Sequence, residues 1–158
     1  MDNYIITKIS KDISLDKELI LKLITIEDKR FFNHNGIDLI RVIGAIIANI
    51  KSFKIKEGAS TISQQVYDIK QQNINLEYNR KRNISRKIKQ VLFALKYEKQ
   101  ESKENILKYY LENVYLGSII FGFKNACKFY FNKSGISLSE KDIIFLLRRV
   151  KRPNDKEY

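Results

Sequence analysis

Two adjacent carboxylates, Glu27 and Asp28, are the residues of this chain best placed to do acid–base chemistry. Two cations, Lys29 and Arg30, follow them directly, and the only histidine of the sequence, His34, comes shortly after. Carboxylates and histidine are the side chains that most often move protons in enzymes. Without further context, ion pairing with the basic neighbours is the better explanation, since most perturbed carboxylates are structural.

The pattern of apolar residues over 15–24 predicts the helix that positions these carboxylates. Ser14 is the expected N-cap, with Asp16 and Glu18 in the first turn, where negative charge is favourable. Glu27 then lies at the C-terminal end of the helix, where the macrodipole disfavours negative charge. Such a carboxylate needs either a cationic partner or a chemical role.

A second polar segment, residues 57–65, offers many hydrogen-bonding groups and little that packs. Ser60, Thr61, Gln64 and Gln65 belong to it. Two interpretations stay open: a turn in which Ser60 or Thr61 caps the next helix, or a polar loop that opens a helix and receives a sugar or a phosphate.

Basic residues crowd the range 80–89, which includes Arg86 and Lys87. A solvated surface is the usual meaning of such a run, and anion binding is its competitor here. The run belongs to a predicted long helix, after an exposed loop over 70–83. The face that we expect this helix to bury comprises Ile84, Ile88, Val91, Leu92 and Leu95.

The most apolar stretch, residues 39–50, predicts a helix whose apolar residues cover more than one face. A well-buried helix is the first interpretation. A helix lying in a membrane interface is the alternative, because Lys51, Lys54 and Lys56 follow directly.

Three further helices are predicted in the second half of the chain. One begins after the N-cap Ser102 and stops at Gly117, the next runs over 122–131, and the last follows a capping box at Ser139. Residues 4–7 are expected to form a short strand.

The composition indicates one mainly helical globular domain. The chain has 158 residues, 44% of them hydrophobic, with one proline and six glycines, too few turn residues for a strand-rich fold. A net charge of +12 attracts nucleic acid, an anionic membrane or a phosphorylated substrate. The lone Cys127 excludes an intrachain disulfide, a Cys/His zinc site is excluded too, and we expect a buried, inert thiol. No signal peptide and no apolar run of about 18 residues is visible.

Taken together, these segments resemble the peptidoglycan glycosyltransferases of glycosyltransferase family 51, the transglycosylase domains of penicillin-binding proteins and their monofunctional relatives. The resemblance runs over residues 23–153, with the motifs in the family's order. The first motif is carried by Glu27, Asp28, Phe31, His34 and Gly36, the second by Gly58, Ser60, Thr61, Ile62, Gln64 and Gln65, and the third by Arg86 and Lys87. The later blocks are carried by Glu98, Ser102, Lys103, Ile106, Leu107, Tyr110, Leu111, Gly117, Gly122, Ala126, Tyr130, Phe131 and Lys133.

The resemblance implies a lysozyme-like, mainly α transglycosylase fold in a single domain over residues 1–158. Residues 37–57 would form its small membrane-facing lobe. The implied reaction polymerises a polyprenyl-diphosphate-linked sugar such as lipid II into glycan strands. The implied partners are that substrate, the membrane surface and other cell-wall synthesis proteins, with no nucleic acid, and the implied location is peripheral at the bacterial cell membrane.

The resemblance also assigns roles. Glu27 would be the general base on the attacking 4-hydroxyl, and Arg86 and Lys87 would stabilise the departing diphosphate. No cofactor is certain, and a divalent cation, Mg or Mn, at the diphosphate is left open. The residues expected to bind substrate are Asp28, Phe31, His34, Ser60, Thr61, Gln64, Gln65, Arg86, Lys87 and Glu98.

Three positions depart from the family pattern. The second catalytic carboxylate of the family is Gln90 here, the usual Lys or Arg after the second motif is Asp68, and a usual asparagine is Glu112. Loss of the charge at Gln90 leads to two expectations: a divergent, weakened glycosyltransferase, or a non-catalytic module that binds lipid II or glycan. Glu98 and Glu112 are the candidates to replace the lost carboxylate. A nucleic-acid binder is the third expectation and rests on charge alone.

Overall fold

The computed structural model describes residues 2–52, 59–74 and 83–155. Within these ranges the chain is helical, with no strand beyond one isolated bridge between Tyr115 and Phe121. The elements are α1 (Asp2–Asp12), α2 (Lys17–Glu27), the 3-10 helix η1 (Phe31–Asn33), α3 (Leu39–Ser52), α4 (Ile62–Ile74), α5 (Ile84–Gln100), α6 (Lys103–Asn113), α7 (Phe123–Phe131) and α8 (Glu140–Lys151). The predicted mainly α fold class is confirmed.

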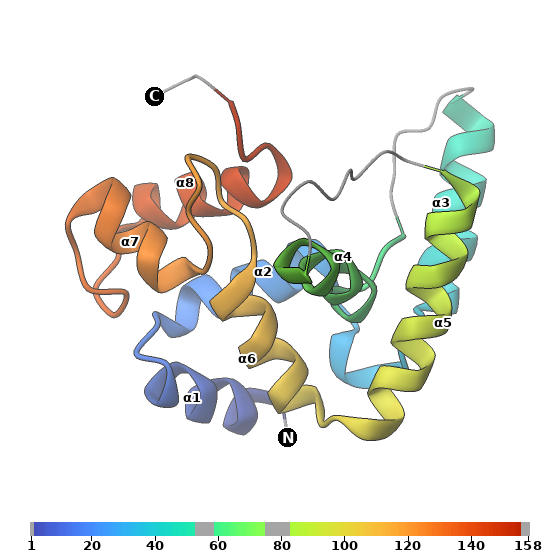
Figure 1. Ribbon diagram of the computed structural model, residues 1–158, viewed down its shortest axis with the longest axis horizontal. Helices are drawn as coiled ribbons and strands as arrows, with labels where there is room; N and C mark the ends of the chain where they lie inside the picture. Colours follow the sequence, from blue (N-terminus) through green and yellow to red (C-terminus); the bar gives the residue numbers. More distant parts are fainter. Residues whose placement is uncertain (1, 53–58, 75–82, 156–158) are drawn as a thin grey trace. The chain divides into compact units, whose positions relative to one another are not determined.

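The chain divides into two compact units. Unit 1 combines Met1–Ile26 with Glu104–Tyr158, and unit 2 is Glu27–Lys103. Figure 1 shows the helices of unit 1 in blue and in orange to red, and α3, α4 and α5 of unit 2 in cyan to yellow-green. The single domain inferred from the sequence stays a prediction.

Unit 1 brings together segments from distant parts of the sequence. The backbone N–H of Asp16 donates to the Gly135 carbonyl at 2.7 Å, and α6 buries the apolar face that its sequence predicts. The strand predicted for residues 4–7 is wrong, because α1 runs through them. Ile6 and Ile9 are both buried, and their spacing of three residues suits a helix face.

The helix caps in unit 1 agree with the sequence only in part. Ser139 caps α8 in a full capping box with Asp142, as predicted. Ser14 does not cap α2: its φ is 51°, in the left-handed region, and Asp16 accepts from the Glu18 backbone N–H at 2.8 Å instead. A carboxylate beside the helix N-terminus is stabilised by the macrodipole as well as by this hydrogen bond.

The link between α6 and α7 contains two glycines in the left-handed region. Gly117 has a φ of 94° in the turn, so the predicted helix stop there is wrong: α6 already ends at Asn113. Gly122 is the N-cap of α7, which begins at Phe123, one residue after the predicted start. Cys127 on α7 is buried, and burial raises the pKa of its thiol to about 11, which confirms an inert thiol.

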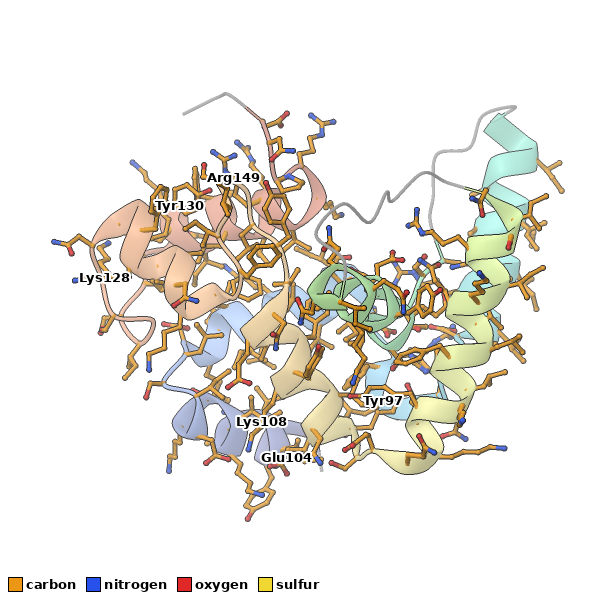
Figure 2. The ribbon with its side chains drawn as sticks, in the orientation of Figure 1. Tyr97, Glu104, Lys108, Lys128, Tyr130 and Arg149 are labelled. Atoms are coloured by element: carbon orange, nitrogen blue, oxygen red, sulfur yellow. The ribbon has the colours of Figure 1, made fainter. Side chains whose placement is uncertain are left out.

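The last helix of unit 1 is anchored by one buried arginine. The Arg149 guanidinium lies 5.2 Å from the ring centre of Tyr130 and 5.0 Å from that of Phe145 (Figure 2). It also donates to the carbonyls of Pro153 and Asp155, each at 2.8 Å. These contacts tie the segment after α8 to the aromatic side chains of α7 and α8.

Unit 2 is organised by the packing of α4 on α5. The ring of Phe93 lies 5.6 Å from Tyr67 and 4.9 Å from Tyr97, measured between ring centres. The Lys70 ammonium adds a cation–π contact, 4.8 Å above the Tyr97 ring. Helix α5 is therefore held to α4 by aromatic rings rather than by the aliphatic face expected from its sequence.

That aliphatic face of α5 is exposed, so the prediction that it is buried is wrong. Ile84 is 80% exposed and Leu92 is 61% exposed, whereas Gln90 and Ala94 are buried. Helix α5 turns its polar and small residues inward because α4 presents polar side chains to it. The loop predicted over 70–83 is wrong for residues 70–74, which belong to α4. Residues 75–82 lie outside the described residues, and Asn83 caps α5 by accepting from a backbone N–H.

Helix α3 is exposed as well, so the first interpretation of residues 39–50 as a buried helix is wrong. Ala45 is buried on it. The exposed apolar side chains of α3 are Leu39, Ile40, Ile43, Ile46, Ile47 and Ile50. Lys54 and Lys56, which motivated the membrane alternative, lie outside the described residues.

Gly36 allows the segment before α3 to approach the backbone of α5 closely. Its φ is +88°, and a Cβ added there would lie 2.8 Å from the carbonyl carbon of Ala94. Gly44 offers a matched contrast in the same unit, because a Cβ added there would meet nothing within 4 Å.

We expect Gly36→Ala to lower the free energy of unfolding by about 2 kcal/mol or more, because it combines a left-handed backbone with a steric clash. Gly44→Ala should be neutral or stabilising by up to about 1 kcal/mol, since alanine favours helix. Urea unfolding followed by circular dichroism measures both. Equal stabilities for the two variants would contradict this account of Gly36.

Candidate active site

Glu27 is the last residue of α2 and is partly exposed. One of its carboxylate oxygens accepts from the Gln65 side-chain amide at 3.1 Å, and its backbone carbonyl accepts from the Arg41 guanidinium. The ion pair with a basic neighbour that the sequence suggested does not form with Arg30, which binds Asp38 instead. Two neutral or backbone-directed contacts thus orient a carboxylate that keeps access to solvent.

The Arg30–Asp38 pair also holds the start of α3. Asp38 is buried and accepts from the Arg30 Nε at 3.0 Å and from the backbone N–H of Arg41 at 2.9 Å. The Arg30 guanidinium holds the pKa of the Asp38 carboxyl below its ordinary value. Since Arg41 binds the Glu27 carbonyl, α3 and the candidate base are joined through one arginine.

Asp28 connects the first motif to the second. It is 0% exposed, accepts from the backbone N–H of Ile62 at 2.9 Å, and lies 3.0 and 3.1 Å from the Nε2 of His34. Ile62 is the first residue of α4, so this carboxylate stabilises a helix N-terminus through both a hydrogen bond and the macrodipole.

Thr61 caps α4, which confirms the capping interpretation for this residue. Its hydroxyl accepts from the backbone N–H of Gln64 at 3.2 Å and donates to the Gly36 carbonyl at 2.7 Å. Thr61 and Gln64 are both buried, whereas Ser60 is partly exposed.

A second buried carboxylate, Glu98, binds polar groups from α4 and from the start of α6. It accepts from the Ser63 hydroxyl and from the Lys103 ammonium, the latter at 2.8 Å. His34 turns its Nδ1 toward Glu98 at 3.9 Å, beyond hydrogen-bond distance. The Lys103 ammonium also lies 4.4 Å from the ring centre of Phe31, and burial lowers the pKa of Lys103 although Glu98 opposes that shift.

Lys87 is the cation that contacts the second motif. Its ammonium donates to the Ser60 hydroxyl at 2.9 Å and to the Gln64 side-chain oxygen at 2.7 Å. Burial lowers its pKa, with Asp68 acting in the opposite direction. An ammonium bound by two neutral oxygens keeps its positive charge to offer to an anion.

Arg86 and Gln90 both bind Asp68. The guanidinium approaches the carboxylate with two nitrogens, at 3.1 and 2.9 Å, and the Gln90 amide donates to it at 2.8 Å. Arg86 therefore lies in the site, but its charge is matched by an acidic partner.

All the predicted site residues lie in unit 2. Four side chains that sequence reasoning left out of the site also belong to these clusters: Arg41, Ser63, Asp68 and Lys103. The sequence drew attention to Asp68, because this residue departs from the family pattern. Nothing in the local sequence indicates that Arg41 belongs to the site. Gly58 of the second motif lies outside the described residues.

The model of a protein family described as "Transglycosylase" matches residues 6–158 of this chain. The chain belongs to the transglycosylase family. The match confirms the family inferred from the motifs and the lysozyme-like helical fold that it implies.

Several curated relatives support this assignment. The chain is 38% identical over 140 residues to penicillin-binding protein 1B of Haemophilus influenzae, covering 86% of this chain and 17% of that protein. It is 35% identical over 144 residues to penicillin-binding protein 1A of Aquifex aeolicus, covering 89% and 19%. It is 36% identical over 132 residues to penicillin-binding protein 1A of Neisseria gonorrhoeae, covering 84% and 16%. The chain thus spans less than a fifth of the length of these relatives.

None of the helices in residues 2–52, 59–74 and 83–155 is long and apolar enough to cross a membrane.

We expect Asp28→Ala to lower the free energy of unfolding by about 2 to 4 kcal/mol, because two buried donors lose their acceptor. Asp155→Ala serves as a control, since its pair with Arg152 is exposed and long at 3.8 Å. The control should change stability by less than about 0.5 kcal/mol. Chemical unfolding measures both, and an Asp28→Ala protein as stable as its control would refute the anchoring role of Asp28.

Proposed function

We propose that this chain is a peptidoglycan glycosyltransferase that elongates a glycan strand from a polyprenyl-diphosphate-linked sugar, lipid II or a close analogue. The supporting observation is the pair of consecutive glutamines on α4. Gln65 binds the Glu27 carboxylate, and Gln64 binds the Lys87 ammonium. One turn of α4 therefore connects a partly exposed base to a cation that is bound through two neutral oxygens.

In the proposed reaction Glu27 accepts the proton of the acceptor 4-hydroxyl while the hydroxyl oxygen attacks the anomeric carbon of the donor. The bond from that carbon to the diphosphate breaks, and the polyprenyl diphosphate leaves with the electron pair. Lys87 stabilises the charge that develops on the diphosphate, and Arg86 adds a fixed donor array nearby. Ser60 is placed to bind the same phosphate or the donor sugar.

We assign positioning roles to the buried members of the predicted substrate-binding set. Asp28 and Phe31 are fully buried, and His34 and Glu98 carry side chains that are 7% and 3% exposed. Such groups orient the motif backbone rather than touch a sugar. The sugar and diphosphate contacts then fall to Glu27, Ser60, Gln65, Arg86 and Lys87, which are partly or fully exposed.

A divalent cation at the diphosphate fits these residues poorly. Among the described residues there is no group of three His, Cys, Asp or Glu side chains that could hold a metal ion. Asp68 is bound by Arg86 and Gln90, which leaves Glu27 as the accessible carboxylate of the site. We therefore derive no step through a metal.

The test is a lipid II polymerisation assay on the wild type and Glu27→Gln, with Glu18→Gln, an exposed carboxylate of unit 1, as the control. We expect Glu27→Gln to reduce the rate by about 100-fold or more, as loss of a general base does, and the control to match the wild type. Lipid II binding that persists in a wild type unable to polymerise would instead support the non-catalytic binding module. That alternative is favoured by one observation, the replacement of the second family carboxylate by Gln90.

We also propose that α3 and α5 form the membrane-facing lobe, at the bacterial cell membrane where the substrate resides. Helix α3 exposes six large apolar side chains, and α5 exposes Ile84, Ile88, Leu92 and Leu95 along one face. Exposed apolar rows of this kind are typical of surfaces that contact lipid or protein. The surplus of cations adds attraction to anionic lipid.

We expect the double variant Ile43→Ser with Ile47→Ser to bind phosphatidylglycerol vesicles about tenfold less tightly or worse, because two apolar side chains no longer enter the lipid. Ile144→Ser, which alters an exposed isoleucine of α8, is the matched control and should bind as the wild type does. Vesicle co-sedimentation at fixed salt measures both. Unchanged binding by the α3 variant would rule out this lobe.

A further inference from the structure

We propose that Asp68 supplies the carboxylate that the family carries at position 90, so that Asp68 and Gln90 are an exchanged pair rather than two independent losses. The inference rests on the proposed function for its role in the reaction. The contact between Asp68 and Gln90 does not depend on the proposed function, because the geometry alone gives it.

The two unusual residues are in direct contact. The Gln90 side-chain nitrogen lies 2.8 Å from Asp68 Oδ2, and both residues are buried, at 6% and 7% exposure. One is on α5 and the other on α4, the two helices whose packing organises unit 2. The negative charge is therefore displaced by about one hydrogen bond from the position where a glutamate at 90 would carry it.

The displaced carboxylate holds Arg86 by two parallel hydrogen bonds. Arg86 Nε lies 3.1 Å from Asp68 Oδ1, and Nη2 lies 2.9 Å from Oδ2. A planar guanidinium bound through two nitrogens has a fixed orientation, which a single point contact would not give. Asp68 thus acts on the site through Arg86, which makes it a positioning residue.

The exchange predicts that neither residue reverts well alone. A glutamate at position 90 would place a carboxylate oxygen against Asp68 Oδ2, and two ionised carboxylates at such a distance repel each other strongly. A lysine at position 68 beside Gln90 would face Arg86 with no negative partner. Lysine at 68 with glutamate at 90, the arrangement of the family, restores an opposite pair.

The exchange also redistributes positive charge in the site. With Asp68 bound to Arg86, their charges cancel, whereas Lys87 is bound to Ser60 and Gln64, and no carboxylate in the described part of the chain lies within hydrogen-bond distance of it. We therefore assign the diphosphate mainly to Lys87 and a positioning role to Arg86.

The structural part is tested by a double-mutant cycle on thermal unfolding of the full chain at pH 7.5. The variants are Asp68→Lys, Gln90→Glu and the two combined, with Gln100→Glu as an exposed control at the end of the same helix. We expect each single change to lower the midpoint by about 5 °C or more and the double variant to return to within about 2 °C of the wild type. The midpoint of the control should stay within about 2 °C of the wild-type midpoint.

Measuring the unfolding midpoint over a pH series adds a test, because loss of packing alone would not make the effect of the variant depend on pH. In Gln90→Glu the repulsion between two carboxylates is present at pH 7.5 and is relieved when one of them takes up a proton at lower pH. The unfolding midpoint of this variant should therefore come closer to that of the wild type as the pH is lowered from 7.5 to 5. Additive effects in the cycle, or a deficit that does not change with pH, would overturn the exchange.

The catalytic part is tested by polymerisation with the same proteins and with Asp68→Asn and Asp68→Glu. We expect Asp68→Asn to lower kcat more than it raises KM, Asp68→Glu to retain most of the rate, and the double variant to exceed both single variants. Faster polymerisation by Gln90→Glu alone than by the wild type would overturn the proposal. If no protein polymerises, the proposed function fails, while the unfolding cycle still decides whether the pair is exchanged.

Discussion

One buried carboxylate, Asp28, is the constraint on which the candidate site depends. It has no exposure to solvent, and it accepts from the first backbone N–H of α4 while binding His34. A buried carboxylate is tolerated only where donors surround it, so its partners cannot be exchanged for water without a large cost. Because α4 begins at this contact, the positions of Gln64 and Gln65, and through them of Lys87 and Glu27, follow from it. The first two motifs are thus one structural feature in space.

The charges of the site are arranged in two kinds of environment. Lys103 binds Glu98, and Arg86 binds Asp68. In each pair the carboxylate balances the positive charge, so the pair orients side chains of the site and adds little net charge. Lys87 is bound by neutral oxygens, and burial lowers its pKa. Such an ammonium attracts an arriving phosphate, because no carboxylate in the described part of the chain lies within hydrogen-bond distance of it. In the proposed reaction we therefore assign most of the stabilisation of the leaving diphosphate to this side chain.

Several elements show where local sequence was sufficient and where it misled. The capping box at Ser139 and the apolar face of α6 depend on residues within one or two turns of each other, and both were predicted. The orientation of α5 was not: its isoleucines and leucines are the obvious candidates for burial, yet the helix buries Gln90 and Ala94. Periodicity identifies two faces of a helix but does not decide which face a polar neighbour such as Asp68 will occupy. The same limit applies to α3: its sequence left a buried helix and a helix at a membrane interface open, since an apolar surface can meet lipid as well as a core.

The sequence by itself determined the family, the helical class and nearly the whole set of candidate site residues, because these follow from residue types at fixed spacing along the chain. Tertiary structure decided which of those residues are accessible and which are buried, and which partners they have. It also showed that Asp68 and Gln90 lie against each other, although they are far apart in the sequence and looked like two separate defects. The physical reason is that a hydrogen bond or an ion pair is a property of two side chains brought together by packing, which no spacing within one helix can specify.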